Sequence, residues 1–344
     1  MKREPYVSHG KWIIMDPVVV QRPSSTSGRI RGAVIVLVYG RGQDLPACLD
    51  SLRVHSPPEV AVIVVDNGSP VPVAPPIAPA YPEVHFLRAA RNRGYAGGNN
   101  VGADYAFTLG APLLYFLNDD TEVTAGFWQA CEEAVQTRGA GVVGSMLVRH
   151  DRPDTIELAG WHLDLRTLGE TYRGVDAKYG PKFADYHPCD GVFGAALMVR
   201  ADLFRALGGF DLSYFHLWEE IDLCLRARGR GEVVACAGRS VVRHKGGASL
   251  GRQKPRYVFY LVRNKIWKWR RHAKSAVFWS YAPRRIARLL LTQLRSDSWL
   301  PRGVPHVLAA WAGTAAGFCW WRPRQLAQFP SVPVPAKELT VAPE

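Results

Sequence analysis

An acidic segment and one histidine stand at positions where they could bind a divalent cation. Asn118, Asp119 and Asp120 follow directly after an apolar run, and His244 ends the strand-like segment VVACAGRSVVRH. Mg²⁺ and Mn²⁺ commonly take carboxylates together with phosphate oxygens, and histidine can complete a metal site. Two structural alternatives stay open, because aspartate is also a good N-cap for a helix over TEVTAGFW and a lone histidine is often structural.

Three acids within four positions form a second cluster. Glu219, Glu220 and Asp222 lie directly after Trp218, at the start of an amphipathic stretch. Acids in the first turn of a helix also suit the helix dipole, which is the structural alternative. Neighbouring carboxylates that are partly buried acquire raised and separated pKa values, and a raised pKa suits a general base. We therefore treat these three acids as catalytic candidates.

Two polar loops indicate a nucleotide site. Asp66 begins the segment DNGS, where an acid could bond a base or ribose, although Asn-Gly is equally a strong turn signal. The segment RNRGYAGGNN brings glycines and amides just ahead of a helix, and such backbone can approach a phosphate closely. The candidate residues for this nucleotide site are Tyr39, Asp66, Asn92, Gly94, Gly97, Gly98, Asn99, Asn118 and Asp119.

The elements that must position these residues alternate between strands and helices. Continuous apolar, β-branched runs at 33–39 and 60–65 predict strands that are buried on both faces of a parallel sheet. The segment PVPVAPPIAPAYP holds six prolines and predicts an irregular loop. Further strands are expected at 84–87 and 113–117, and helices at 45–54 and 103–109. Ligands of such open sheets bind at the carboxyl ends of the strands.

The chain divides into a catalytic body and a basic extension. The formal net charge is +13, yet residues 251–324 alone hold sixteen Lys/Arg and one acid, so the body is near neutral and is not built to coat nucleic acid. We expect a loosely ordered leader at 1–31, an α/β catalytic domain at 32–255 (halves 32–125 and 126–255), a helical basic appendage at 256–325 and a tail at 326–344.

The appendage has two interpretations. Seven of the eleven tryptophans lie between Trp267 and Trp321, interleaved with Lys and Arg. Basic, aromatic helices bind anionic membrane surfaces. The alternative is a helical subdomain packed on the catalytic body with a solvated charged face.

Cysteine use and hydropathy bear on the compartment. The six cysteines show no CxxC pattern and predict reduced, buried thiols rather than a disulfide framework or a zinc site. The N-terminal residues carry no apolar run typical of a signal peptide. The uncharged run at 307–321 is shorter than the roughly 20 residues that span a bilayer. We expect a cytoplasmic protein, peripheral at the cytoplasmic face of the membrane.

The order of six motifs resembles the family 2 glycosyltransferases of the GT-A fold. The motifs are DNGS, RNRGYAGGNN, LNDDTEV, DGVFGAALMVRADLFRALGGFD, YFHLWEEIDLCLRARGRG and HKGGAS, within about residues 32–275. The chain is most similar to the bacterial rhamnosyltransferase and galactofuranosyltransferase branch, which builds cell-wall and surface polysaccharide. The resemblance implies a Rossmann-like open mixed sheet flanked by helices.

The resemblance also implies roles for single residues. Asp66 would meet the base or ribose, Asp120 and His244 would bind the cation, and Glu220 would be the catalytic base. Asn92 and the segment 94–99 would line the nucleotide pocket.

Two positions depart from the family pattern. Relatives usually have Glu-Asp where this chain has Glu219 and Glu220, so the base is one methylene longer, and Asp222 or Glu219 could take its role. Relatives more often have proline in place of Asp119. Candidates for the acceptor side are Trp161, His162, Asp190 and Trp218.

The sequence thus predicts an inverting, metal-dependent glycosyltransferase that uses Mg²⁺ or Mn²⁺. The donor would be a nucleotide diphosphate-sugar such as dTDP-rhamnose or a UDP-sugar, and the acceptor a saccharide or lipid-linked saccharide. A nucleotidyltransferase and a non-catalytic nucleotide- or membrane-binding module are the alternatives. The expected partners include an anionic membrane surface through 256–325 and a homo-oligomer, but no nucleic acid.

Overall fold

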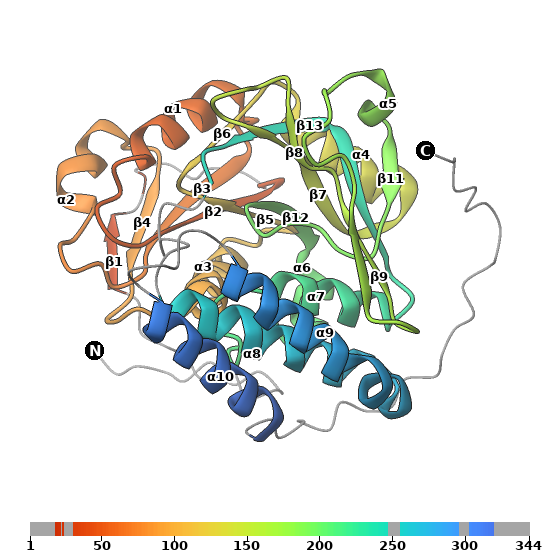
Figure 1. Cartoon of the computed structure of the whole chain (residues 1–344). Helices are drawn as coiled ribbons and strands as arrows, with labels where there is room; N and C mark the ends of the chain where they lie inside the picture. The colour runs from red at the N-terminus through yellow and green to blue at the C-terminus, as the bar shows by residue number, and fades with distance from the viewer. Residues whose placement is uncertain (1–17, 22, 24–29, 247–254, 296–302, 320–344) are drawn as a thin grey trace.

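A sheet of eleven strands runs through the described part of the chain (Figure 1). The computed structural model describes residues 18–21, 23, 30–246, 255–295 and 303–319. The main strand order is β1-β4-β3-β2-β5-β12-β7-β13-β11, while β6 pairs with β13, β8 pairs with β7, and β9 and β10 form a separate hairpin. The strands are β1 (Val18–Gln21), β2 (Gly32–Val38), β3 (Val60–Asp66), β4 (His85–Arg88), β5 (Leu113–Asn118), β6 (Thr121–Val123), β7 (Ala140–Arg149), β8 (Ile156–Leu158), β9 (Trp161–Asp164), β10 (Gly169–Tyr172), β11 (Tyr186–Pro188), β12 (Ala196–Arg200) and β13 (Val233–His244).

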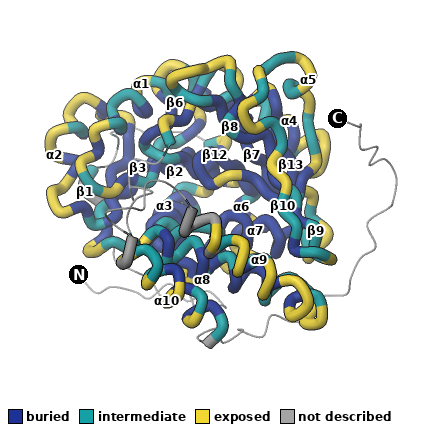
Figure 2. Tube along the Cα trace, in the orientation of Figure 1, coloured by how far each residue is buried: buried dark blue, intermediate teal, exposed yellow. Residues whose placement is uncertain are grey.

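Helices cover both faces of this sheet. The helices are α1 (Leu45–His55), α2 (Ala74–Ile77), α3 (Gly94–Thr108), α4 (Phe127–Arg138), α5 (Pro181–Ala184), α6 (Ala201–Leu207), α7 (Glu219–Arg228), α8 (Pro255–His272), α9 (Ser275–Arg295) and α10 (Gly303–Cys319). One core contains residues of α1, α2 and α4, and the other contains residues of α3, α6 and α7. Along β2, Val34 and Val36 face the first core while Ala33 and Ile35 face the second, so the strand is buried on both sides (Figure 2).

The strands expected in the first half are all present. β2, β3, β4 and β5 pair in parallel, so their carboxyl ends lie at one edge. The proline-rich segment was expected to be an irregular loop, but it forms α2 and a 3₁₀ turn at Ala78–Ala80. Each of these turns has proline at its first or second position, where no intrahelical N–H is needed. α3 begins at Gly94, earlier than the expected 103, because its glycines pack directly against the sheet.

Part of the expected leader belongs to the sheet, since β1 pairs antiparallel with β4. The segments 1–17 and 24–29, the tail 326–344 and residues 247–249 of the HKGGAS motif lie outside the described residues. Five cysteines of the described chain are buried free thiols: Cys48, Cys131, Cys189, Cys224 and Cys236. None of the described helices has the length and apolar character that a bilayer span requires.

The basic extension forms α8, α9 and α10, which pack together beside the α3, α6 and α7 layer (Figure 1). Their shared core includes Val262 and Ile266 of α8, Phe278 of α9 and Ala310 of α10. Leu168, from the hairpin region of the body, belongs to the same cluster, so the extension is packed on the body.

We predict that Gly102→Ala destabilises the protein, although alanine favours a helix by about 1 kcal/mol over glycine. A Cβ at Gly102 would overlap the side chain of Ile35 and lie 3.0 Å from Val65. Such overpacking costs about 1–3 kcal/mol, so the unfolding midpoint in urea should fall. Gly180→Ala is the matched control, because its Cβ would meet nothing within 4 Å. Equal midpoints for both variants would contradict this packing.

Candidate active site

Loops from distant parts of the chain meet at the carboxyl edge of the sheet. β5 ends at Asn118, and the antiparallel strand β12 begins opposite it, with Ala196 paired to Leu117. β13 ends at His244, which pairs with Thr121 of β6. Sheet pairing alone therefore places the Asn-Asp-Asp segment, the start of β12 and His244 at the same edge.

The buried His244 ring lies between two carboxylates, those of Glu157 and Asp120. Its Nδ1 lies 2.7 Å from Oε2 of Glu157, and its Nε2 lies 3.5 Å from Oδ1 of Asp120. Burial lowers the pKa of His244, but hydrogen bonding and charge attraction from both carboxylates outweigh it and raise the pKa to about 9. The Nε2–Asp120 separation of 3.5 Å makes this a long, weak contact, whereas the Nδ1–Glu157 contact is a short one.

Asp120 and His244 fit a divalent cation. A histidine that binds a metal commonly bonds a carboxylate through its other ring nitrogen, which is what Glu157 provides. Among the described residues, no group of three or more His, Cys, Asp or Glu could hold a metal. A cation here would therefore need oxygens from a substrate, as Mg²⁺ commonly has. Asp119 is next in sequence, with a pKa raised to about 7 by burial and by the nearby Asp120 and Asp44 carboxylates.

Asp66 organises the turn that follows β3. Its Oδ1 accepts a hydrogen bond from the Ser69 amide at 2.8 Å, and its Oδ2 accepts one from the Val73 amide at 3.3 Å. Arg88 forms an ion pair with the same carboxylate. The Ser69 hydroxyl accepts a hydrogen bond from the Gly40 amide, directly after the partly exposed Tyr39. Asp66 thus shapes the loop whatever further contact its carboxylate makes.

Asn67 fixes the glycine-rich segment against this turn. Its Oδ1 accepts from the Arg93 amide at 3.1 Å, and its Nδ2 donates to the Gly94 carbonyl at 3.0 Å. Asn92 adds a second clamp, because its Oδ1 accepts from the Gly94 amide at 2.8 Å. The N-cap residue of α3, Arg93, forms no side-chain cap of its own, and the Arg93 and Gly94 amides are bonded by Asn67 and Asn92 instead.

The glycines of this segment permit close packing. A Cβ at Gly94, where φ is +71°, would overlap the backbone of Phe215, and a Cβ at Gly98 would lie 3.0 Å from Cγ of Asn67. A Cβ at Gly97 would lie 2.6 Å from Cβ of Arg93. Asn99 is buried, with its Nδ2 bonded to the Tyr95 carbonyl and its Oδ1 without a hydrogen-bond partner.

Glu219 and Glu220 are buried at the start of α7 and have separate protonation behaviour. Burial and the neighbouring carboxylate raise the pKa of Glu219 well above its ordinary value. Burial raises the pKa of Glu220 to about 7, against the opposing effects of backbone hydrogen bonds and of the Lys268 ammonium. Oε2 of Glu219 has no hydrogen-bond partner. Glu220 therefore titrates near neutral pH, while Glu219 stays protonated.

Asp222 occupies a different environment. Its carboxylate oxygens lie 2.7 Å from Nε of Arg226, 2.9 Å from a guanidinium nitrogen of Arg271 and 2.8 Å from Nε2 of His272. Burial raises its pKa, but these three partners outweigh burial and hold the pKa well below its usual range. Asp222 therefore ties α7 to α8 as a buried anion.

The loop that leads into α7 has a strained backbone. Phe215, Leu217 and Trp218 have φ values of 64°, 72° and 75°, in the left-handed region. This conformation costs an L-residue about 1–2 kcal/mol, and such strain persists only where surrounding contacts hold it.

The segment 193–195 joins the two groups of candidates. Phe193 lies edge-on to the His244 ring, with centroids 6.3 Å apart. A Cβ at Gly194 would lie 2.9 Å from the Tyr95 hydroxyl and 3.5 Å from Cβ of Glu220. The Gly194 carbonyl accepts a hydrogen bond from that hydroxyl at 2.5 Å. The histidine, the glycine-rich segment and Glu220 are thus neighbours of a single stretch of chain.

The acceptor-side candidates lie in two settings. Trp161 is 1% exposed and packs against Trp218, whose ring centroid is 6.4 Å away. Asp190 forms an ion pair with Arg228 and accepts from the Leu163 amide at 2.8 Å. His162 lies 3.7 Å from the Asp190 carboxylate. Trp161, His162 and Asp190 are therefore engaged in packing and polar contacts, while Trp218 is partly exposed beside the acids.

Sequence reasoning did not single out several residues that support the site. Glu157 orients His244, Asn67 fixes the glycine-rich segment, and Lys268 acts on Glu220. Asn67 lies within the DNGS motif, which could have identified it. Glu157 and Lys268 carry no local signal, because their partners are distant in sequence.

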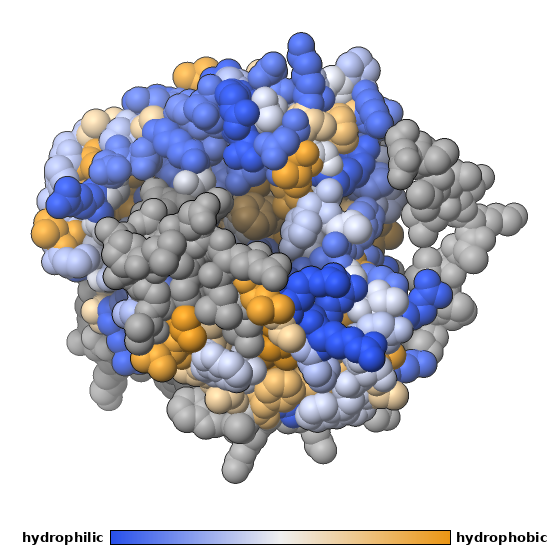
Figure 3. Space-filling model, viewed as in Figure 1, coloured by the Kyte–Doolittle hydropathy of each residue, from blue (hydrophilic) through white to orange (hydrophobic). Residues whose placement is uncertain are grey.

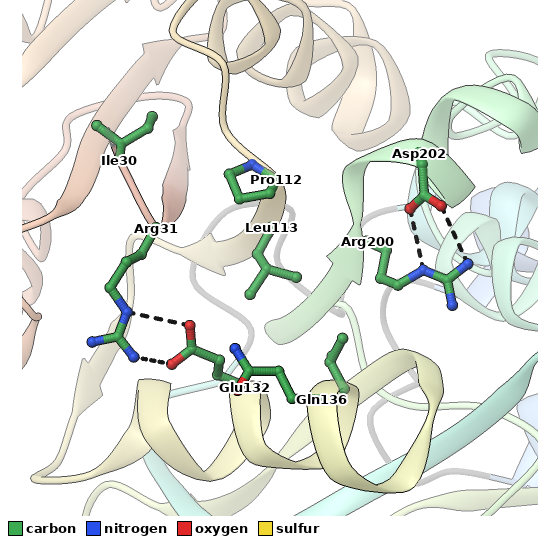
Figure 4. Close-up of a pocket in the computed structure, with 9 residues that line it drawn as sticks. Ile30, Arg31, Pro112, Leu113, Glu132, Gln136, Arg200 and Asp202 are labelled. Atoms are coloured by element: carbon green, nitrogen blue, oxygen red, sulfur yellow. Dashed lines mark hydrogen bonds and ion pairs between the residues drawn. The ribbon is translucent and has the colours of Figure 1, made fainter. Parts of the chain in front are cut away.

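A cleft of about 530 Å³ lies at the other end of the strands (Figure 4). It is lined by the residues that lead into β2 and β5 and the first residue of β5, by α4, and by the junction between β12 and α6. Its charged groups are paired, Arg31 with Glu132 and Arg200 with Asp202. The candidate residues of the carboxyl edge do not line it.

Comparisons with known proteins bear on the family. The family model described as "Glycosyl transferase family 2" matches residues 33–208. An uncharacterised protein of Mycobacterium tuberculosis is 30% identical over 179 residues, 48% of this chain and 60% of that protein. The N-acetylglucosaminyl-diphospho-decaprenol L-rhamnosyltransferase of M. tuberculosis is 25% identical over 271 residues, 69% of this chain and 86% of the relative. The chain thus spans less than two thirds of the first of these relatives.

Solved structures bear on the fold. A mannosyltransferase from Pyrobaculum calidifontis, in complex with GDP-Man and Mn²⁺, matches with a TM-score of 0.53 and 17% identity, covering 89% of this chain and 79% of that one. The expected GT-A fold, an open mixed sheet flanked by helices, is confirmed. With the family model matching about half of its length, the chain belongs to glycosyltransferase family 2 and resembles its rhamnosyltransferase members.

Proposed function

We propose that this glycosyltransferase moves a sugar from a nucleoside diphosphate-sugar to a saccharide hydroxyl, with inversion at the anomeric carbon. One observation carries the proposal: a carboxylate–histidine pair suited to a cation and a buried acid of raised pKa both border residues 193–195. The donor would be of the dTDP-rhamnose or UDP-sugar type. The lipid diphosphate in the name of the M. tuberculosis rhamnosyltransferase supports a lipid-linked acceptor in cell-wall or surface polysaccharide synthesis.

The residues of the site take different proposed roles, namely cation binding, phosphate binding and general-base catalysis. A divalent cation, Mg²⁺ or Mn²⁺, would neutralise the charge that develops on the diphosphate. Asp120 and His244 would hold it, and Glu157 keeps the His244 ring oriented. Asn67 and Asn92 already bond the Arg93 and Gly94 amides, so the amides that follow Gly94 in the first turn of α3 are the ones suited to phosphate oxygens. Glu220 takes the proton of the attacking hydroxyl, because its pKa lies near neutrality while Glu219 stays protonated.

The same proposal places the enzyme at the cytoplasmic face of an anionic membrane. The described parts of α8, α9 and α10 contain no Asp or Glu. Trp279 and Trp311 are 58% and 62% exposed, and Leu308 is 62% exposed. Figure 3 shows apolar patches over α10 beside a strongly hydrophilic patch over α9. Exposed aromatics beside cations match the chemistry of an anionic lipid surface.

Glu220→Gln should reduce sugar transfer by about 10²–10⁴-fold, the usual contribution of a general base. Binding of the nucleoside diphosphate, measured by calorimetry, should stay within about twofold, because the amide keeps the shape of the side chain. Transfer by the wild type should rise with pH through about 7 and then level off, since the base must be deprotonated. Glu219→Gln is the matched control, and full activity of Glu220→Gln would place the base elsewhere.

Mn²⁺ should strengthen the binding of a nucleoside diphosphate, and Glu157→Gln should weaken the metal-dependent part about 10–100-fold. Glu122→Gln serves as control, because Glu122 makes a similar contact, 2.9 Å from Nε2 of His150. Calorimetry with and without Mn²⁺ measures both. Metal-independent affinity would favour a non-catalytic binding module, and turnover of a nucleoside triphosphate with a sugar phosphate would favour a nucleotidyltransferase.

The protein should co-sediment with vesicles that contain phosphatidylserine, and less so as salt increases. Replacing Arg284 and Arg288 by Glu should reduce binding at least about tenfold, because each cation near the surface contributes about 1 kcal/mol. Val54→Ser tests an exposed apolar residue of α1 and should change nothing. Wild-type protein that stays in the supernatant at low salt would refute the membrane assignment.

A further inference from the structure

One face of α8 runs along the strained loop and the first turn of α7. Four side chains of α8 share this face, because they are spaced as neighbours on a helix surface. They are Asn264, Lys268, Arg271 and His272. Lys268 lies 3.7 Å from the centroid of the Trp218 ring, and the last two bind the Asp222 carboxylate. The contacts follow the loop in chain order, from 214 to 222.

Of these four side chains, Asn264 is the first along α8 and contacts three carbonyl groups of the loop. The side chain is buried, and its Oδ1 accepts a hydrogen bond from Nε of Arg263 at 2.8 Å, which leaves the amide nitrogen to donate. That nitrogen lies 2.9, 2.8 and 2.8 Å from the carbonyl oxygens of residues 214, 216 and 217. Two amide hydrogens therefore serve three carbonyls of one loop.

These carbonyls belong to the peptide groups that set the strained angles. The φ angle of a residue is the rotation about its N–Cα bond, measured from the carbonyl carbon of the preceding residue to its own carbonyl carbon. The carbonyls of Tyr214, His216 and Leu217 directly precede the residues with φ of 64°, 72° and 75°. Fixing their peptide planes opposes a return of each residue to the ordinary region.

The loop is held on its other sides as well. The Phe215 ring stacks on Tyr260 of α8, with centroids 5.3 Å apart and planes 19° from parallel. Arg263 donates to the Ser213 and Tyr214 carbonyls at 2.9 Å. The Phe215 backbone closes on Gly94, so the loop cannot shift toward the glycine-rich segment without a clash.

We propose that Asn264 is a positioning residue that holds the loop 214–218 in its strained form and thereby aims Glu220 at the acceptor hydroxyl. The proposal rests on the proposed function for its catalytic part. Its structural part stands alone, because the order of the loop can be measured without any substrate. Val262, on the opposite face of α8, packs in the cluster shared with α9, α10 and Leu168 and supplies the matched control.

The test compares Asn264→Leu, which keeps the shape and removes the donors, with Val262→Ala. Hydrogen–deuterium exchange is followed at the amides of His216 and Asp222, which bond the Tyr214 and Trp218 carbonyls. We expect exchange at least about tenfold faster in Asn264→Leu and unchanged in Val262→Ala. We also expect kcat to fall about 10²-fold while the Kd of the nucleoside diphosphate with Mn²⁺ stays within twofold.

Each other outcome counts against the proposal. Unchanged exchange, or a kcat that falls equally in Val262→Ala, makes Asn264 a purely structural residue. Fast exchange with an unchanged kcat shows that the loop need not be ordered for transfer. If Asn264→Leu does not fold, Asn264→Ser, which keeps one donor, should show the same effects in weaker form. A wild type that transfers no sugar refutes the proposed function, and exchange still decides whether Asn264 holds the loop.

Discussion

The antiparallel insertion of β12 between β5 and β7 is the constraint on which the site depends. Its register, with Ala196 opposite Leu117, places residues 193–195 at the carboxyl edge of otherwise parallel neighbours. A one-residue slip would exchange the faces of β12, so that Ala196 and Met198 would turn into the core that now holds Leu197 and Val199, and the reverse. The glycine at 194 then lets Tyr95 and Glu220 approach from one side, while Phe193 meets His244 on the other. Candidate residues that are distant along the chain are thus brought to one stretch of the sheet edge.

Three acids of one helical turn show how environment, rather than residue type, separates their roles. Asp222 is buried with three cationic or donor partners and stays ionised. Glu219 is also buried, but one of its carboxyl oxygens has no hydrogen-bond partner, and the group stays protonated. Glu220 lies between these extremes, because backbone donors and Lys268 partly offset its burial. Carboxyl groups whose pKa values are driven apart in this way can be assigned distinct tasks.

Sequence patterns predicted the elements whose signal is local. Strands such as β2 and β3 are continuous β-branched runs, and their type and place were predicted correctly. The start of α3 was missed because a glycine-rich segment is typical of a loop, whereas here Gly98 and Gly102 allow the helix to pack against Leu37 and Ile35 of β2. Asp120, His244 and Glu220 were singled out through motif order, and their roles stay predictions. Glu157 and Asn264 could not be, because their partners lie 87 and about 50 residues away and no local pattern links them.

The basic extension shows the limit of charge counting. Its composition predicts a membrane-binding surface or a packed subdomain with a solvated charged face, but several of its cations point into the body and are neutralised there. Lys265 and Lys268 both bind Glu170, and Arg271 binds Asp211 as well as Asp222. The cations that remain exposed, such as Arg284 and Arg288, lie on α9. One segment therefore has an inner face that contacts the loop ahead of α7 and an outer face that carries exposed cations.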